Sequence, residues 1–347
     1  MKLGIAAASF GPRARIDIAF VKRAEELGFD SAWTAEAYGN DAATTATWVL
    51  AQTTKLKVGT AIMQMPARTP AMTAMTAMTL DHLSGGRFIL GLGPSGPQVV
   101  EGWHGVPYGK PLTRTREYIE ILRQIFAREK PLEFHGEIYD IPTRAKGSSG
   151  LGKPLKSILH GNPAIPIYTA SISPNGMRCA GEVADGVFPM MLDPEKVEEV
   201  YLDYIEEGFA KASTPKSLEN FAIVPAVSVI ISDDLEKARM PVKGMMSLYI
   251  GGMGARDKNF YNDLAIRLGF EEAAVKIQNL FLDGKKMEAM AAVPDELVDA
   301  VHLVGSKDRI RDRLQAWKEA GRKRHVDTLQ VGTNQIEALE LLAEEIL

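Results

Sequence analysis

Cysteine is the residue that this sequence lacks most clearly, because Cys179 is the only one among 347 residues. A single cysteine cannot form a disulfide within the chain, which fits a reducing compartment. The chain also begins without the apolar stretch that marks a signal peptide. No apolar run approaches the ~18 residues that a membrane-spanning helix needs. The sequence therefore predicts a cytoplasmic protein that does not enter membranes.

An excess of positive charge is also missing. The chain has 40 Lys and Arg against 44 Asp and Glu, and its formal net charge is −4. This balance gives no electrostatic reason to expect nucleic acid as a partner. The 6 histidines are scattered without the spacing of metal ligands, and there is no Gly-x-Ser-x-Gly nucleophile elbow. We therefore expect neither a metal site nor a hydrolase of that class.

The sequence does contain a regular alternation of short apolar runs with amphipathic segments. Apolar residues at helical spacing follow most of the runs, as in repeated strand–helix units. This pattern predicts an α/β fold, a (β/α)8 TIM barrel, with a doubly wound open sheet as the alternative. The predicted strands are residues 3–10, 31–34, 57–63, 88–92, 165–170, 186–192, 222–231 and 326–331.

Two stretches are longer than a simple barrel requires. Residues 132–143 alternate in polarity and carry aromatics, which predicts a small hairpin within an insertion at about residues 131–160, after the fourth strand. Residues 234–300 have a helical pattern throughout, which predicts several helices before the last strand, over one side of the barrel mouth. We expect residues 1–347 to form a single domain with these two insertions.

Residues 71–79 repeat the triplet Ala-Met-Thr three times. A period of three is close to the 3.6 residues of a helical turn, so a helix is predicted here. The favoured interpretation places the methionines as a stripe packed into the core. A pliable ligand-binding surface is the alternative.

The stretch 87–98 is the first candidate for a binding surface. A short apolar strand breaks there into a loop of Gly, Pro and Ser, which continues neither a strand nor a helix. Glycine lets a backbone approach a ligand closely, and chemistry in parallel barrels takes place at the carboxyl ends of the strands. A tight turn without a ligand is the alternative.

The same rule places the other strand ends beside this loop. The residues at these strand ends include few catalytic groups and many small residues, backbone amides and hydrogen-bonding side chains. A protein that holds a flat cofactor has such a surface, because the cofactor itself does the chemistry. The predicted strand-end residues are Ser9, Phe10, Glu36, Tyr38, Ala61, Ile62, Met63, Gln64, Gly93, Ser95, Gln98, Ala170, Ser171, Ile172 and Ser173.

The loop 171–176 suits a phosphate group. It leads into a predicted helix, whose first N–H groups carry partial positive charge, and two serine hydroxyls add donors. Ser173 is also typical of a helix N-cap, with Pro174 at the first helical position. The two roles are compatible with each other.

Several motifs resemble the bacterial luciferase-like superfamily. Others resemble its branch that uses the deazaflavin coenzyme F420, similar to methylenetetrahydromethanopterin reductase-like proteins. The superfamily motifs are Asp-Ser-Ala-Trp-Thr-Ala-Glu at 30–36, Val-Gly-Thr-Ala-Ile at 58–62, the stretch 80–93 and Ala-Asp-Gly-Val at 184–187. The coenzyme F420 motifs are the stretch 95–105, Asn-Phe-Tyr-Asn-Asp-Leu-Ala at 259–265 and Gly-Phe-Glu-Glu at 269–272.

The resemblance implies specific features of the site. A non-prolyl cis peptide is expected at Ala61–Ile62, where relatives form a bulge that supports the coenzyme ring from behind. Ser171 to Ser173 match the phosphate site of the family, and Glu36 matches an acidic residue near the ring. Some relatives carry a histidine after that acidic residue. Ala37 stands here instead and cannot transfer a proton.

We therefore expect an oxidoreductase that transfers a hydride between coenzyme F420 and a small organic substrate. Glu36 and Tyr38 are the predicted catalytic residues. The alternatives are an FMN-dependent monooxygenase and a barrel that only binds the coenzyme. The resemblance also implies a homodimer. The predicted coenzyme-binding residues are Glu36, Ala61, Ile62, Gln64, Gly93, Ser95, Gln98, Ala170, Ser171, Ile172 and Ser173.

Overall fold

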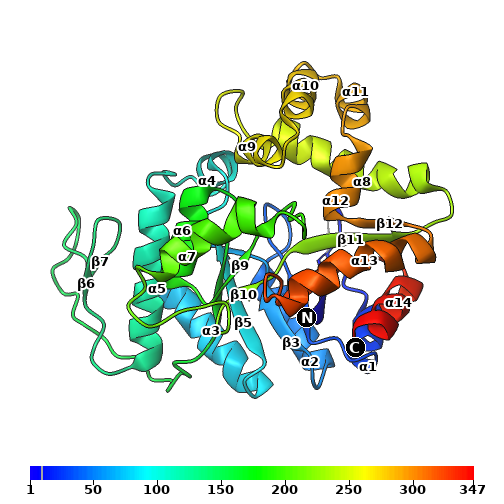
Figure 1. Cartoon of the computed structure of the whole chain (residues 1–347). Coiled ribbons are helices and arrows are strands. Elements are labelled where there is room, and N and C mark those ends of the chain that lie inside the picture. The colour runs from blue at the N-terminus through cyan, green and yellow to red at the C-terminus, as the bar shows by residue number, and fades with distance from the viewer. Residues whose placement is uncertain (9–10) are drawn as a thin grey trace.

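The main sheet of the protein is parallel and curls around a central axis (Figure 1). The computed structural model describes residues 1–8 and 11–347, so the predicted site residues Ser9 and Phe10 lie outside the described residues. The strands of this sheet are β1 (Lys2–Ala6), β2 (Ser31–Thr34), β3 (Lys57–Thr60), β4 (Met63–Gln64), β5 (Phe88–Gly93), β8 (Ile167–Ala170), β9 (Gly186–Phe188), β10 (Ala222–Ile223), β11 (Ala226–Ile231), β12 (Leu303–Gly305) and β13 (Thr328–Gly332).

Helices follow most strands along the chain and surround the sheet in Figure 1. Several begin where the sequence predicts a cap, as at Ser306, whose hydroxyl accepts from the backbone N–H of Arg309. The helices are α1 (Ile18–Glu26), α2 (Ala42–Gln52), α3 (Pro70–Ser84), α4 (Pro97–Gly102), α5 (Pro111–Ala127), α6 (Pro174–Val183), α7 (Asp203–Phe209), α8 (Leu235–Gly252), α9 (Phe260–Arg267), α10 (Glu271–Leu282), α11 (Lys286–Ala291), α12 (Asp295–Val301), α13 (Lys307–Arg322) and α14 (Ile336–Ile346).

The predicted strand 222–231 closes the sheet into a barrel. Pro225 cannot donate to a strand ladder and divides this stretch into β10 and β11. β10 pairs with β9, whereas β11 pairs with β13, which lies beside β1. The carbonyl of Pro225 still accepts from the backbone N–H of Gln330, at 2.9 Å. The predicted (β/α)8 barrel is confirmed, and the one short strand not predicted, β12, pairs with β11.

The predicted strand 57–63 is interrupted, and β5 lies close against it. A non-prolyl cis peptide joins Ala61 to Ile62, as expected, and separates β3 from β4. The Thr60 hydroxyl accepts from the N–H of Gly91 at 2.9 Å and donates to its carbonyl at 2.8 Å. A Cβ atom at Gly91 would lie 1.7 Å from the carbonyl oxygen of Thr60, so only glycine fits there.

The barrel interior is filled by large side chains from β2, β8 and β9. The rings of Trp33 and Phe188 meet edge to face with centroids 5.2 Å apart, and Tyr168 packs against both. A second and larger core lies between the sheet and its helices. Since the interior is packed, a ligand must bind at an end of the barrel.

The methionine repeat forms α3, as predicted, but the predicted methionine stripe in the core is wrong. Met78 is buried, whereas Met72 and Met75 are 52% and 54% exposed. A step of three residues falls short of a full helical turn, so successive methionines rotate around the helix. Ala74 and Ala77 reach the buried face beside Met78 instead.

Both predicted insertions are present. β6 (Phe134–His135) and β7 (Asp140–Ile141) pair as an antiparallel hairpin, at the left of Figure 1. α8 to α12 make up the helical insertion, and α9, α10 and α11 stand away from the barrel at the top of the view. Across the described parts of the chain, no helix combines the length and apolar character needed to cross a membrane.

Candidate functional site

The predicted site residues lie at the carboxyl ends of β2, β4, β5 and β8, which are neighbours in the barrel. Gln64 and Gly93 are direct partners in the pairing of β4 with β5. A Cβ atom at Gly93 would lie 2.7 Å from Cδ1 of Ile62, so the Ile62 side chain packs directly against the end of β5. The structure therefore brings Ala61, Ile62, Gln64 and Gly93 together.

Glu36 is held by the protein at both of its carboxylate oxygens. Oε1 accepts from the backbone N–H of Gln64 at 2.7 Å and from Nη1 of Arg68 at 2.6 Å. Oε2 accepts from the backbone N–H of Ala42 at 3.0 Å. The side chain is only 7% exposed. This arrangement ties β4 to the start of α2, while the role of Glu36 in proton transfer stays a prediction.

Gln64 links two segments that the sequence does not place together. Its side chain is buried, and its Nε2 donates to the backbone carbonyl of Ala37 at 2.5 Å. Its Oε1 lies 2.9 Å from Nε2 of His104, in the loop after α4. Because Oε1 can only accept, His104 carries a proton on Nε2 in this contact. A histidine thus reaches the strand-end cluster, although no histidine was predicted there.

The other predicted site residues that follow β2 and β5 differ in exposure. Ser95 has a φ of 59°, in the left-handed region that non-glycine residues seldom occupy, and such residues concentrate at functional sites. Gln98 is exposed on α4. Tyr38 is 69% exposed. Burial raises the pKa of Tyr249 on α8, and the Tyr38 phenol adds to that rise, so Tyr38 lies toward the helical insertion.

The predicted phosphate loop follows Ala170, the last residue of β8. Ser173 is the N-cap of α6, and its Oγ accepts from the backbone N–H of Gly176 at 3.1 Å. A Cβ atom at Gly176 would lie 2.9 Å from Oγ of Ser171 and 3.0 Å from Oγ of Ser173. Both hydroxyls therefore converge on the first turn of α6 and form a small cradle, which fits the predicted phosphate role of residues 171–173.

Arg267 reaches the same loop from the helical insertion. Its Nη2 donates to the backbone carbonyl of Ile172 at 2.5 Å, across 95 positions of sequence. Its Nε is buried and has no hydrogen-bond partner within residues 1–8 and 11–347. Arg68, His104 and Arg267 were all missed by the sequence analysis. Arg68 follows the third predicted strand closely, so the expected convergence of strand ends could have identified it. No local signal marks His104 or Arg267.

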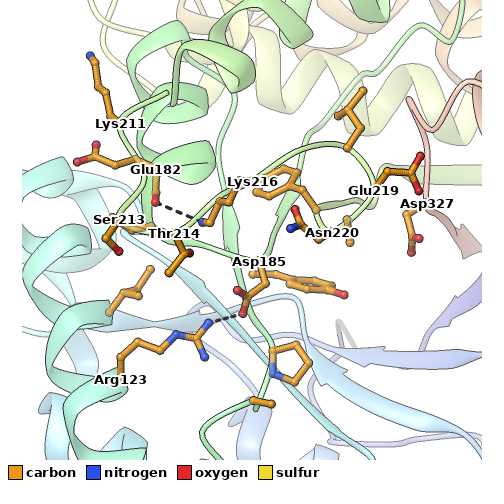
Figure 2. A pocket seen from close by; sticks show the side chains of 18 of the residues that line it. Arg123, Glu182, Asp185, Lys211, Ser213, Thr214, Lys216, Glu219, Asn220 and Asp327 are labelled. Carbon is orange, nitrogen blue, oxygen red and sulfur yellow. Dashed lines mark hydrogen bonds and ion pairs between the residues drawn. The ribbon is translucent and has the colours of Figure 1, made fainter. Parts of the chain in front are cut away.

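A large cavity lies at the opposite end of the barrel (Figure 2). It has a volume of about 1080 Å³ and is lined by residues that precede strands, among them Asp185 before β9 and Asp327 before β13. Several of its charged groups form ion pairs, among them Arg123 with Asp185 and Lys2 with Asp327. Barrel chemistry takes place at the carboxyl end, so we assign this amino-end cavity no catalytic role.

Comparison with known proteins agrees with this geometry. A protein of Mycobacterium tuberculosis, provisionally named a coenzyme F420-dependent oxidoreductase, is 44% identical over 92% of this chain and 93% of its own. The 5,10-methylenetetrahydromethanopterin reductase of Archaeoglobus fulgidus is 29% identical over 94% of this chain and 93% of its own.

Among solved structures, the coenzyme F420-dependent tetrahydromethanopterin reductase from Methanopyrus kandleri is similar, with a TM-score of 0.78 and 26% identity. The match covers 99% of this chain and 98% of that one. The family model described as luciferase-like monooxygenase matches residues 2–324. The chain therefore belongs to the luciferase-like monooxygenase family.

Proposed function

We propose that the protein is an oxidoreductase that transfers a hydride between coenzyme F420 and a small organic substrate. The observation that carries this proposal is the 44% identity, over nearly the whole chain, to a relative provisionally named a coenzyme F420-dependent oxidoreductase. The cradle around Gly176 supports it, because two hydroxyls and a helix N-terminus suit the phosphate of such a coenzyme. FMN, which also carries a phosphate, is the alternative coenzyme.

The coenzyme ring is proposed to lie over the ends of β4 and β5. There Ala61 and Ile62 would support one face of the ring, with the Ile62 side chain packed against Gly93. Gln64 would present its edge toward the ring, fixed by His104. The other proposed contacts are Ser95 and Gln98 near the ring, and Ala170, Ser171, Ile172 and Ser173 at the phosphate.

Coenzyme F420 supplies the hydride chemistry when it is bound, and the chain must position the ring and exclude water. Glu36 is proposed to hold the loop beneath the ring, since both of its oxygens already accept hydrogen bonds from the protein. A substrate that gains a hydride also needs a proton. Tyr38 is the proposed donor, because its phenol is exposed and the neighbouring Ala37 has no group that can donate a proton.

Titration of the purified protein with coenzyme F420 and with FMN, each followed by its own fluorescence, tests the proposal. Tighter binding of coenzyme F420 is expected. Tight binding of FMN with no binding of coenzyme F420 would overturn it. With the coenzyme identified, a screen of enones, imines and alcohols would define the substrate class, and binding without turnover of any substrate would favour a barrel that only holds the coenzyme.

A further inference from the structure

We propose that Arg267 binds the phosphate of the coenzyme directly, so that the helical insertion completes the binding site. This inference rests on the proposed function, because the phosphate belongs to the proposed coenzyme. It adds a residue from α9, far along the sequence from the loop between β8 and α6, to the groups that hold that phosphate. The insertion then contributes to coenzyme affinity and does more than cover the barrel mouth.

The hydrogen bond to Ile172 fixes where the guanidinium lies. Nη2 of Arg267 donates to the carbonyl of Ile172, between the two serines whose hydroxyls converge on the first turn of α6. A guanidinium has five N–H donors in a rigid plane, and a single carbonyl uses only one of them. The other donors remain available at the edge of the cradle, where the proposed phosphate would lie.

The electrostatic environment of Arg267 also favours an anion. Among the described residues, Arg267 has no acidic partner within ion-pair distance, although its side chain is partly buried and its Nε is buried without a hydrogen bond. A buried donor without a partner is costly. Lys196 adds a second cation nearby, because its Nζ donates to the carbonyl of Leu268 at 2.8 Å. A phosphate would satisfy the charge and the terminal Nη donors, which are not enclosed by the protein as Nε is.

Other arginines of the same insertion lie beside carboxylates. Arg239 forms ion pairs with Glu236, Asp295 and Asp299, and its guanidinium is thereby neutralised. Arg256 lies 3.9 Å from Asp283. Arg267 differs from both, because its guanidinium donates to the carbonyl of Ile172, next to Ser171 and Ser173, and has no carboxylate within ion-pair distance among the described residues. Arginine forms bidentate hydrogen bonds with phosphate, which this position allows.

The test compares two ligands and two variants. The ligands are coenzyme F420 and the deazaflavin nucleoside that lacks its phosphate-bearing tail, and dissociation constants are measured by fluorescence. Arg267→Met is expected to weaken binding of coenzyme F420 by about 10- to 100-fold, in line with the loss of charge-assisted hydrogen bonds. Its affinity for the nucleoside should stay within about twofold, since that ligand has no phosphate. Arg256→Met, the matched control, should leave both affinities unchanged.

The outcomes separate this inference from the proposed function. If the wild-type protein binds neither ligand, the proposed function fails. If it binds coenzyme F420 and Arg267→Met binds it equally well, or loses both ligands to the same extent, Arg267 does not contact the phosphate. Should Arg267→Met fail to fold, Arg267→Lys keeps the charge and loses the planar fork. A selective loss of coenzyme F420 affinity in that variant supports the inference, and unchanged affinity overturns it.

Discussion

The two ends of the barrel differ in how completely the protein satisfies its own polar groups. At the amino end, a cavity of about 1080 Å³ is lined by several ion pairs, such as that of Arg123 with Asp185 (Figure 2). At the carboxyl end, Arg267 lacks an acidic partner among the described residues, and its Nε is unpaired. Ser95 also holds a left-handed conformation there.

If the coenzyme binds at the carboxyl end as proposed, the size of a cavity is a poor guide to function in this protein. In the amino-end cavity, several lining cations already donate to the protein, and Lys216 donates to the backbone carbonyls of Glu182 and Ala184. Burial lowers the pKa of Lys216, which fits a lysine enclosed by carbonyls. The carboxyl end instead offers unpaired donors beside a helix N-terminus. Substitutions at both ends, with matched controls, test the contrast.

The largest effect is expected at Glu36. In Glu36→Gln, the amide NH2 group would face one of the three N–H donors that now surround the carboxylate, and Arg68 would lose a buried partner. The free energy of unfolding should fall by about 3 kcal/mol, and coenzyme affinity should fall with it. Denaturant unfolding measures the first quantity. Asp41→Asn, which removes the more exposed partner of Arg68, should have a smaller effect.

An opposite result at Glu36 would restore its predicted role in the chemistry. If Glu36 transfers a proton, Glu36→Gln should retain its stability and bind coenzyme within about threefold of wild type, while turnover falls by ~10²-fold or more. Tyr38→Phe distinguishes the two roles further. It should lower turnover by a similar factor if the phenol is the donor, without any change in stability.

His302 tests whether a buried polar atom without a hydrogen-bond partner always indicates a ligand site. Its Nδ1 accepts from the backbone N–H of Ser228 at 3.0 Å, and its Nε2 has no partner. Burial lowers the pKa of His302 from 6.5 to about 4, so the unfolded chain takes up a proton first as pH falls. The contribution of His302 to the free energy of unfolding should be fully present above pH ~6.5, and about 3 kcal/mol of it should be lost by pH ~4.

Unfolding curves at several pH values measure this loss. His302→Asn keeps an acceptor for Ser228 and should remove most of the pH dependence between ~6.5 and ~4. His82→Gln, at an exposed histidine, is the control and should keep it. An unchanged pH dependence in His302→Asn would show that His302 is not the group responsible. Neither change should alter coenzyme affinity, in contrast to Arg267.

Two serine caps separate a structural role from a phosphate role. Ser173 and Ser306 both cap helices through their hydroxyls, but only Ser173 lies in the proposed cradle. Each serine-to-alanine change should lower stability by ~1 kcal/mol. Ser173→Ala should also weaken coenzyme binding by ~1.5–3 kcal/mol, measured by fluorescence titration. Equal coenzyme affinity in the two variants would leave Ser173 as a cap alone.

The smallest effect is expected at the amino end. Arg123→Met breaks the partly exposed ion pair with Asp185 and should lower stability by about 1 kcal/mol or less. The dissociation constant for coenzyme F420 should not change. Weaker coenzyme binding in this variant would show that the amino-end cavity takes part in the function.

The sequence was sufficient to predict the barrel and which strand ends converge, because both follow from local patterns. Apolar runs marked the strands, and the strand-end rule brought Gln64 and Gly93 to one face, where they are direct partners. The division of the predicted strand 222–231 was also indicated locally, by Pro225, but was not predicted. The methionine repeat was misjudged, since its period differs from the helical one by enough to turn Met72 and Met75 outward.

The contacts that no local pattern encodes could not be predicted. His104 meets Gln64 only after the loop beyond α4 folds back, and Arg267 meets Ile172 only once the insertion packs over the barrel. The engagement of Glu36 by Ala42, Gln64 and Arg68 likewise depends on tertiary structure. Sequence could identify which strand ends converge, but it could not show which of their polar groups were already satisfied.

A crystal structure of the protein with bound coenzyme F420 tests most directly the claim that function belongs to the carboxyl end. The phosphate is predicted beside Ser173, Gly176 and Arg267, with the ring over the ends of β4 and β5. Coenzyme bound in the amino-end cavity, between Arg123 and Lys216, would contradict it.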